Sequence, residues 1–122
     1  GPFMAKRVNT LATGNGAVTL SVAELLGGFV EDTTHTGGVT LTTPTGAEIC
    51  AAIPGYAVGT SWYFTYANDG NQTTTIAAGA SGVTLVGIET IATKCVKTFL
   101  VIITASDTVS ITNITGSTSY AS

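Results

Sequence analysis

The sequence predicts an all-β domain, namely a jelly-roll-like antiparallel β-sandwich with one or two short helical turns. Roughly seven to nine short strand-like runs are separated by residues that favour turns, which is typical of sandwiches and jelly rolls. About one residue in five is threonine, whose branched side chain favours strands and whose hydroxyl wets an outward face without charge. A chain of 122 residues has the size of one domain.

The chain is poor in charge and rich in apolar residues. Only 9% of its residues are charged, against about 25% in ordinary soluble domains, and the mean hydropathy is +0.44. Such a domain can cover itself with neutral hydroxyls or bury apolar area against other subunits, and we expect both. No run approaches the roughly 18 apolar residues of a membrane span, so we expect no membrane insertion. A net charge of −3 argues against nucleic acid as a partner, because nucleic acid is bound by clustered Lys and Arg.

The two ends of the chain are set apart from the domain. Gly1-Pro2 is what a tag-removing protease leaves behind, so residues 1–3 are interpreted as tag-derived and residues 4–122 as a single β-sandwich domain. We expect residues 4–16 and 115–122 to be loosely attached. No apolar signal region follows Lys6-Arg7. Either the protein leaves its cell by assembly or lysis, or the domain was cut from a longer chain.

The first half is expected to alternate strands with two brief helical turns. Ser21 and Glu24 fit a capping box, in which Ser caps the helix and Glu three residues later bonds back. Thr45 and Glu48 fit a second one, and these caps explain both acids without catalysis. Strands are expected at residues 17–20, 29–32 and 39–42, with a polar loop at 33–38.

The second half is expected to be entirely β. Asp69-Gly70 is a strong hairpin signal. The long run 95–103 is apolar on both faces, whereas a sandwich strand normally hides one face only. Its second face is therefore expected to lie against another subunit, with Phe99, Val101 and Ile103 in that interface. Strands are expected at residues 61–67, 72–77, 83–86, 89–91, 95–103 and 108–112.

No metal, cofactor or catalytic site is predicted. His35 is the single histidine, and with no second His or nearby Cys one chain lacks the ligands for a metal. A symmetric trimer could gather three copies on its axis, but we expect a solvated loop histidine. No nucleophile, base and orienting group fall into a recognisable arrangement, so we expect no enzyme.

Cys50 and Cys95 leave two alternatives open. A disulfide between them would close a long loop and stabilise the fold by roughly 4 kcal/mol. Alternatively, both are small buried hydrophobes in a reducing compartment, and we favour free thiols because nothing marks the chain as secreted.

The aromatic stretch around residues 61–67 supplies the candidate ligand site. Trp62 and Phe64 are expected in the core. Tyrosines can stack on a sugar ring, because the phenol has an apolar face and a polar tip. A core or interface position is the competing interpretation for each tyrosine. The candidate ligand-binding residues are Tyr56, Tyr63, Tyr66, Asn68 and Asp69.

Several turn and packing motifs carry a family resemblance from about Thr19 to Ile111. The motifs are Leu25-Leu26-Gly27-Gly28, Ile53-Pro54-Gly55, Ala57-Val58-Gly59-Thr60, Phe64-Thr65, Ala77-Ala78-Gly79 and Gly82-Val83-Thr84-Leu85. With them the chain resembles small β domains at the ends of fibre-like proteins of phages and large DNA viruses, and on trimeric adhesive fibres of predatory bacteria. The resemblance implies a trimeric β-sandwich tip used in surface attachment, so the interface expected at Phe99, Val101 and Ile103 would be a trimer interface. Cys50 and Cys95 are not part of the pattern.

Two function classes follow. The first is a homotrimeric fibre-tip or adhesion domain, on a virion surface or a cell-surface fibre, that binds host or prey surface components, above all glycans, with several weak sites at once. The alternative is a structural virion component, such as a capsid decoration or assembly domain, without a host ligand.

Overall fold

The computed structural model describes residues 8–11, 15–33, 35–87 and 89–115, and the backbone alone at 8–11. Residues 1–3, which were expected to be tag-derived, and residues 116–122 of the tail lie outside the described residues. The chain is mostly strand, with two short helices. In chain order the elements are β1 (Val8–Leu11), β2 (Gly16–Thr19), α1 (Val22–Gly27), β3 (Phe29–Asp32), β4 (Val39–Thr42), α2 (Gly46–Ala51), β5 (Ser61–Asn68), β6 (Thr74–Ala77), β7 (Val83–Val86), β8 (Thr90–Ile91), β9 (Cys95–Ala105) and β10 (Thr108–Asn113).

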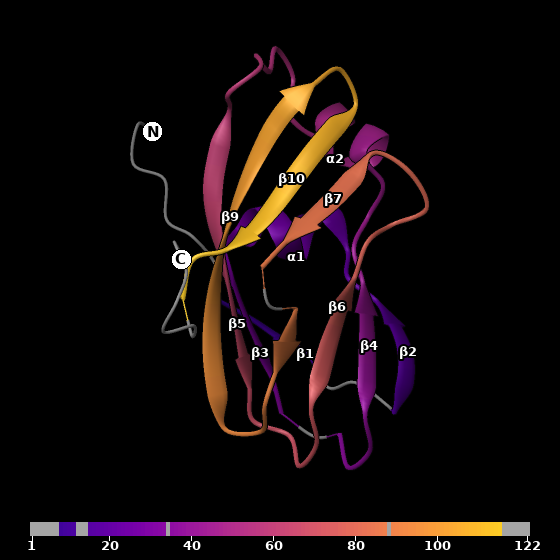
Figure 1. Cartoon of the computed structure of the whole chain (residues 1–122), viewed down its shortest axis with the longest axis vertical. Helices are drawn as coiled ribbons and strands as arrows, with labels where there is room; N and C mark the ends of the chain where they lie inside the picture. Colours follow the sequence, from indigo (N-terminus) through magenta and orange to yellow (C-terminus); the bar gives the residue numbers. More distant parts are fainter. Residues whose placement is uncertain (1–7, 12–14, 34, 88, 116–122) are drawn as a thin grey trace.

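The strands form two sheets that are consistent with a β-sandwich (Figure 1). Sheet A has the order β1-β3-β5-β9-β10-β7, and sheet B has the order β2-β4-β6-β8. Five of the eight pairs among the described strands are parallel, so the prediction of purely antiparallel sheets was wrong. A jelly-roll order stays a prediction.

The chain path explains the parallel pairs. From β1 to β8 the chain alternates between the two sheets, so each strand returns to its own sheet only after crossing the other one. The returns from β1 to β3 and β5, and from β2 to β4 and β6, keep the strand direction, so these strands pair in parallel, whereas β8 returns antiparallel to β6. Among the described strands, only β9 and β10 follow each other within one sheet, and they form an antiparallel hairpin.

Both predicted capping boxes are confirmed. The Ser21 hydroxyl accepts from the Glu24 N–H at 3.1 Å while the Glu24 carboxylate accepts from the Ser21 N–H at 2.8 Å. Thr45 and Glu48 repeat the arrangement at 3.1 and 2.9 Å. Each box starts a six-residue helix between a strand of sheet B and a strand of sheet A, so the first half holds the same strand–helix–strand unit twice.

The core lies between the two sheets and beneath the helices. Phe64 is buried as predicted, and Trp62 is half-buried with its indole N–H donating to the Leu25 carbonyl at 3.2 Å. The largest buried hydrophobic side chains are Leu20, Leu25, Val30, Leu41, Ile49, Phe64, Tyr66, Ile76, Ile91, Phe99, Val101, Ile103, Val109 and Ile111.

Two local predictions need correction. Residues 4–16 were expected to be loose, but residues 8–11 form β1, which pairs with β3 along its length. Asp69-Gly70 does form a turn, yet it is not a hairpin, because it joins β5 of sheet A to β6 of sheet B. Turn residues fix the local bend, while the sheet that each following strand joins depends on distant partners.

Candidate functional site

The outward side of sheet A is the first candidate surface. Phe64 and Tyr66 of β5 are buried, so the alternate residues of that strand face outward. The register places outward Tyr63 beside Leu100 and Ala67 beside Val96, and Tyr63 is 61% exposed. We call this surface the outer face of sheet A; its outward residues on the two central strands are Ser61, Tyr63, Thr65, Ala67, Val96, Thr98, Leu100 and Ile102.

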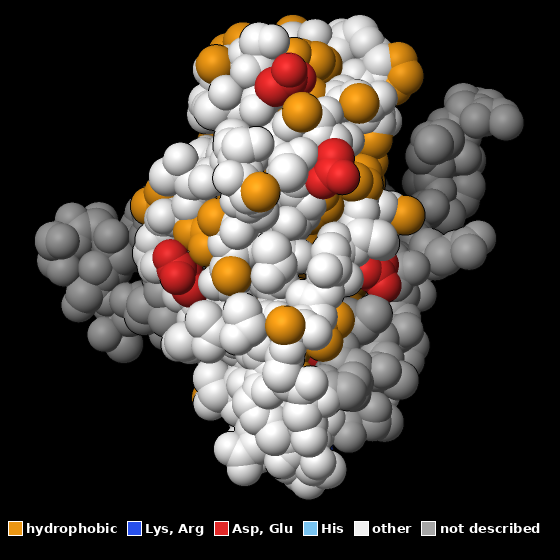
Figure 2. Space-filling model, turned by 90° about the vertical axis from the view of Figure 1, so that its right-hand side faces the viewer, with side chains coloured by type: hydrophobic (Ala, Val, Ile, Leu, Met, Phe, Trp, Pro, Cys, Tyr) orange, Lys and Arg blue, Asp and Glu red, His pale blue; other side chains and the backbone are white. Residues whose placement is uncertain are grey.

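The outer face of sheet A is apolar or hydroxyl-bearing along β5 and β9. Among the large hydrophobic side chains that are exposed in the described residues, Tyr63, Val86 and Val96 lie on this face, and Ile114 follows directly after β10. On a different side of the molecule, Figure 2 shows isolated acidic side chains among neutral ones, with no Lys or Arg side chain visible. Charged side chains are therefore sparse on that side as well, and those visible there are acidic.

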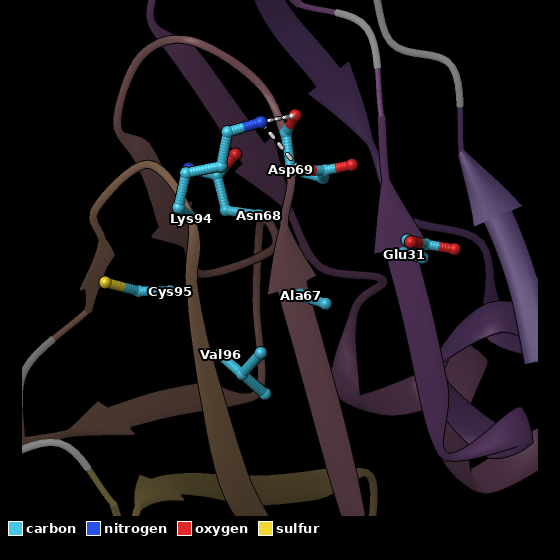
Figure 3. A pocket seen from close by; sticks show the side chains of 7 residues that line it. All are labelled: Glu31, Ala67, Asn68, Asp69, Lys94, Cys95 and Val96. Atoms are coloured by element: carbon cyan, nitrogen blue, oxygen red, sulfur yellow. Dashed lines mark hydrogen bonds and ion pairs between the residues drawn. The ribbon is translucent and has the colours of Figure 1, made fainter.

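A shallow hollow interrupts the outer face at the end where β9 begins. Glu31, Ala67 and Val96 stand in one row across β3, β5 and β9, and the small side chain of Ala67 leaves the space between its larger neighbours. The hollow has a volume of about 300 Å³. We call it the Ala67 hollow (Figure 3); its lining residues are Glu31, Ala67, Asn68, Asp69, Lys94, Cys95 and Val96.

An ion pair closes one end of the Ala67 hollow. The Lys94 ammonium lies 2.7 Å from the Asp69 carboxylate and also donates to the Asp69 carbonyl at 3.2 Å. Both side chains are exposed, so the pair adds little stability but offers charged donors and acceptors to a ligand. Lys94 has a φ of 62°, a left-handed conformation that turns the chain into β9.

A buried polar cluster lies behind this end of the sheet. Its members, Asp32, His35, Tyr66, Asn68 and Thr74, are at most 2% exposed. The Tyr66 hydroxyl donates to the Asp32 carboxylate and lies 3.1 Å from the Thr74 hydroxyl. Burial, together with the bond to Asp32, raises the pKa of the Tyr66 phenol above its ordinary value. Because these side chains are buried and bonded to one another, we interpret the cluster as structural.

His35 was expected in solvent, and that prediction was wrong: the side chain is 1% exposed. The side-chain oxygen Oδ1 of Asn15 accepts from the N–H groups of Thr36 and Gly37 at 3.0 and 2.8 Å and so holds the β3–β4 loop beside residue 15. Gly70 then lies flat against the imidazole, where a Cβ would overlap the ring atoms. The His35 ring fits in this position because Gly70, which faces it, has no side chain.

The predicted ligand residues fall on different sides of the sheet. Tyr66 is 0% exposed and bonds inside the cluster, so the expectation that it contacts a ligand is corrected. Asn68 is 2% exposed and its side chain bonds inside the cluster, but the residue also lines the Ala67 hollow. Tyr56 is half-buried and packs against the core. Tyr63 is exposed on the outer face, and Asp69 lines the Ala67 hollow.

The predicted interface residues are also corrected. Phe99, Val101 and Ile103 are 3%, 0% and 0% exposed and belong to the chain's own core. The second apolar face of β9 exists, but Val96, Leu100 and Ile102 form it. Sequence reasoning found the doubly apolar strand and assigned its two faces the wrong way round.

Both cysteines are free in the structure. Cys50 is buried in α2, while Cys95 is exposed at the start of β9. Figure 3 shows the Cys95 sulfur directed away from Glu31 and Asp69. This agrees with the free thiols that were favoured from the sequence, but the expectation that both side chains are buried is wrong for Cys95.

Glu31, Lys94 and the buried cluster were missed by sequence reasoning. One signal was available for the cluster. The period-two alternation that buries Val30 and Tyr66 continues to Asp32 and Asn68, which places both polar side chains on the inward face.

Within the described ranges, no group of three His, Cys, Asp or Glu side chains is placed to hold a metal ion. No helix among the described elements has the length and apolar character needed to cross a bilayer. Comparisons with protein-family models, with curated proteins and with solved structures found no match.

Proposed function

We propose that the chain is a non-enzymatic adhesion domain, the tip of a homotrimeric fibre that binds glycans or other cell-envelope components on a virion or cell surface. The observation that carries the proposal is the outer face of sheet A, which combines exposed apolar side chains with a small polar hollow. A jelly-roll-like trimer with one weak site per chain would bind through avidity.

The apolar part of the outer face supports self-association. Tyr63 and Val96 are 61% and 56% exposed beside Leu100 and Ile102, on strands that carry no outward charge. Contiguous exposed apolar surface of this kind marks interaction sites. In a closed trimer each contact is head-to-tail, so this face would pack against a different surface of the next copy, and its lack of charge leaves no buried charge that would need a partner there.

The Ala67 hollow supports the glycan class. It offers the carboxylates of Glu31 and Asp69 and the ammonium of Lys94 above the apolar side chains of Ala67 and Val96. Carboxylates accept hydrogen bonds from sugar hydroxyls, and an ammonium donates to sugar oxygens. The hollow and the Leu100 region lie about 13 Å apart along β9, so one face has room for both roles.

Native mass measurement tests self-association. A stable trimer is expected, and a lysine at the exposed position, Tyr63→Lys, should shift the mass toward the monomer. The matched control is Thr40→Lys, which adds the same charge at an exposed position of β4 in sheet B. A monomeric parent protein would overturn the trimer.

A glycan array and binding to intact cells test adhesion. Ala67→Leu fills the hollow and should abolish glycan binding, whereas Thr40→Leu should keep it. A trimer that binds neither glycans nor cells would contradict adhesion and favour the structural virion component, which should co-purify with capsids.

A further inference from the structure

Both ring nitrogens of His35 face oxygen acceptors. Nδ1 lies 3.0 Å from the Gly37 carbonyl oxygen, and Nε2 lies 2.8 Å from Oδ1 of Asn68. A backbone carbonyl can only accept a hydrogen bond, so Nδ1 must carry a proton. The protonation of Nε2 then depends on which end of the Asn68 amide faces it.

Three further bonds fix the orientation of the Asn68 amide. Its Oδ1 accepts from the Gly70 N–H at 3.0 Å, and its Nδ2 donates to the carbonyls of Gln72 and Ile91, both at 2.9 Å. A flipped amide would turn its N–H groups toward the Gly70 N–H and its oxygen toward two carbonyls. The acceptor oxygen therefore faces Nε2, and this nitrogen must be a donor as well.

A neutral imidazole cannot satisfy this environment, because it has one N–H and one bare lone pair. The bare nitrogen would face an oxygen lone pair in a site where His35 is 1% exposed. Such an unsatisfied buried contact is costly.

The charge of a doubly protonated ring has a partner. Oδ2 of Asp32, at the end of β3, lies 3.8 Å from Nε2. From β5 the ionisable Tyr66 donates its hydroxyl to the same carboxylate, and from β6 the neutral Thr74 lies 3.5 Å from Nε2. From β8 the Ile91 carbonyl accepts from Asn68 Nδ2 and adds no charge.

We propose that His35 is an imidazolium clamp that joins the β3–β4 loop to the β5–β6 turn while its ring carries both protons. The loop is held through the Gly37 carbonyl and the turn through Asn68, and the Asn71 N–H also donates to the His35 carbonyl at 3.0 Å. Loss of either ring proton breaks one side of the clamp.

The clamp makes this end of the sandwich sensitive to pH. The folded chain holds a proton that an unfolded histidine releases above about pH 6.5. A folded state that binds more protons loses stability as the pH rises. Asp69 and Asn68 of the clamped turn also line the Ala67 hollow. Provided that the proposed glycan binding holds, binding should weaken over the same pH range.

Nitrogen-15 NMR of the intact protein tests the clamp directly, because the chain contains one histidine. At pH 7.5 both ring nitrogens are expected at the chemical shift of protonated imidazolium, whereas the urea-unfolded chain should show the neutral ring. One nitrogen at the shift of an unprotonated acceptor in the folded protein would overturn the proposal.

Two variants separate the clamp from simple packing. Asp32→Asn keeps an acceptor for the Tyr66 hydroxyl but removes the carboxylate opposite His35, so at pH 7.5 one ring nitrogen should move to the chemical shift of an unprotonated acceptor. Unchanged shifts of both nitrogens contradict the proposal. His35→Gln should abolish the dependence of the unfolding free energy on pH near neutrality; if it does not fold, the parent NMR and Asp32→Asn decide. These readouts involve no glycan, so a failed glycan array with both nitrogens protonated would contradict the proposed function alone.

Discussion

The hydroxyl of Tyr66 supplies the sharpest stability prediction. Tyr66 is fully buried, and its hydroxyl donates to the Asp32 carboxylate and lies 3.1 Å from the Thr74 hydroxyl. Tyr66→Phe removes one oxygen atom and keeps the ring in place. The buried carboxylate then loses a donor that water cannot replace.

The magnitude follows from the bond that is lost. A hydrogen bond to a charged group contributes about 1.5–3 kcal/mol, and a buried acceptor left short of a donor adds a desolvation cost. We expect Tyr66→Phe to lower the unfolding free energy by about 2–3 kcal/mol. With a urea slope of about 2 kcal/mol/M, the midpoint should fall by roughly 1–1.5 M.

The assay is urea unfolding, followed by tryptophan fluorescence, at one fixed chain concentration, because self-association changes apparent stability. Tyr63→Phe is the matched control on the same strand. Its side chain is 61% exposed, so the change should stay within about 0.5 kcal/mol. Equal midpoints for the two variants would refute the view that the Tyr66 hydroxyl satisfies a buried carboxylate.

Three further predictions concern the same fold. Because the pKa of the buried Tyr66 phenol is raised, the folded chain keeps the phenol proton at a pH at which the unfolded chain has lost it. The unfolding free energy should therefore fall as the pH rises above about 10. An alkaline absorbance titration should show this phenol ionising only when the chain unfolds. Gly46→Ala should destabilise the chain by about 3 kcal/mol or more in urea, because a Cβ there overlaps the Asp107 carbonyl oxygen. The control Gly38→Ala meets only one atom, at 4.0 Å, and a similar loss there would contradict this reasoning. In a thiol assay, Cys95 should react in the native protein and Cys50 only after unfolding; native protection of both would show that the exposed thiol is covered.

Features that depend on neighbouring residues could be predicted from the sequence. Each capping box spans four residues, and both helices start at the predicted caps, Ser21 and Thr45. The long strand expected at 95–103 is β9, because its length and apolar content are local properties. The composition likewise predicted two packed sheets, because residues that favour strands occur along most of the chain.

Whether neighbouring strands run parallel or antiparallel could not be predicted from neighbouring residues. Asp69-Gly70 favours a tight turn whether the next strand joins the same sheet or the other one. The structure shows the second case, because β6 pairs with β4 and not with β5. Parallel pairing follows from that choice, and the choice depends on partners far along the chain.

The strand β9 and the buried polar cluster separate what the sequence determined from what only the tertiary structure decided. The sequence determined that β9 has two apolar faces. It could not show which face is buried, because the side chains alternate in the same way in both cases, and only the packed core shows that Phe99 and Val101 face inward. In the same way, the residues next to His35 in the sequence predict an exposed loop position for it. It is buried because Asn68 and Gly70, more than 30 residues away, supply its acceptor and its space.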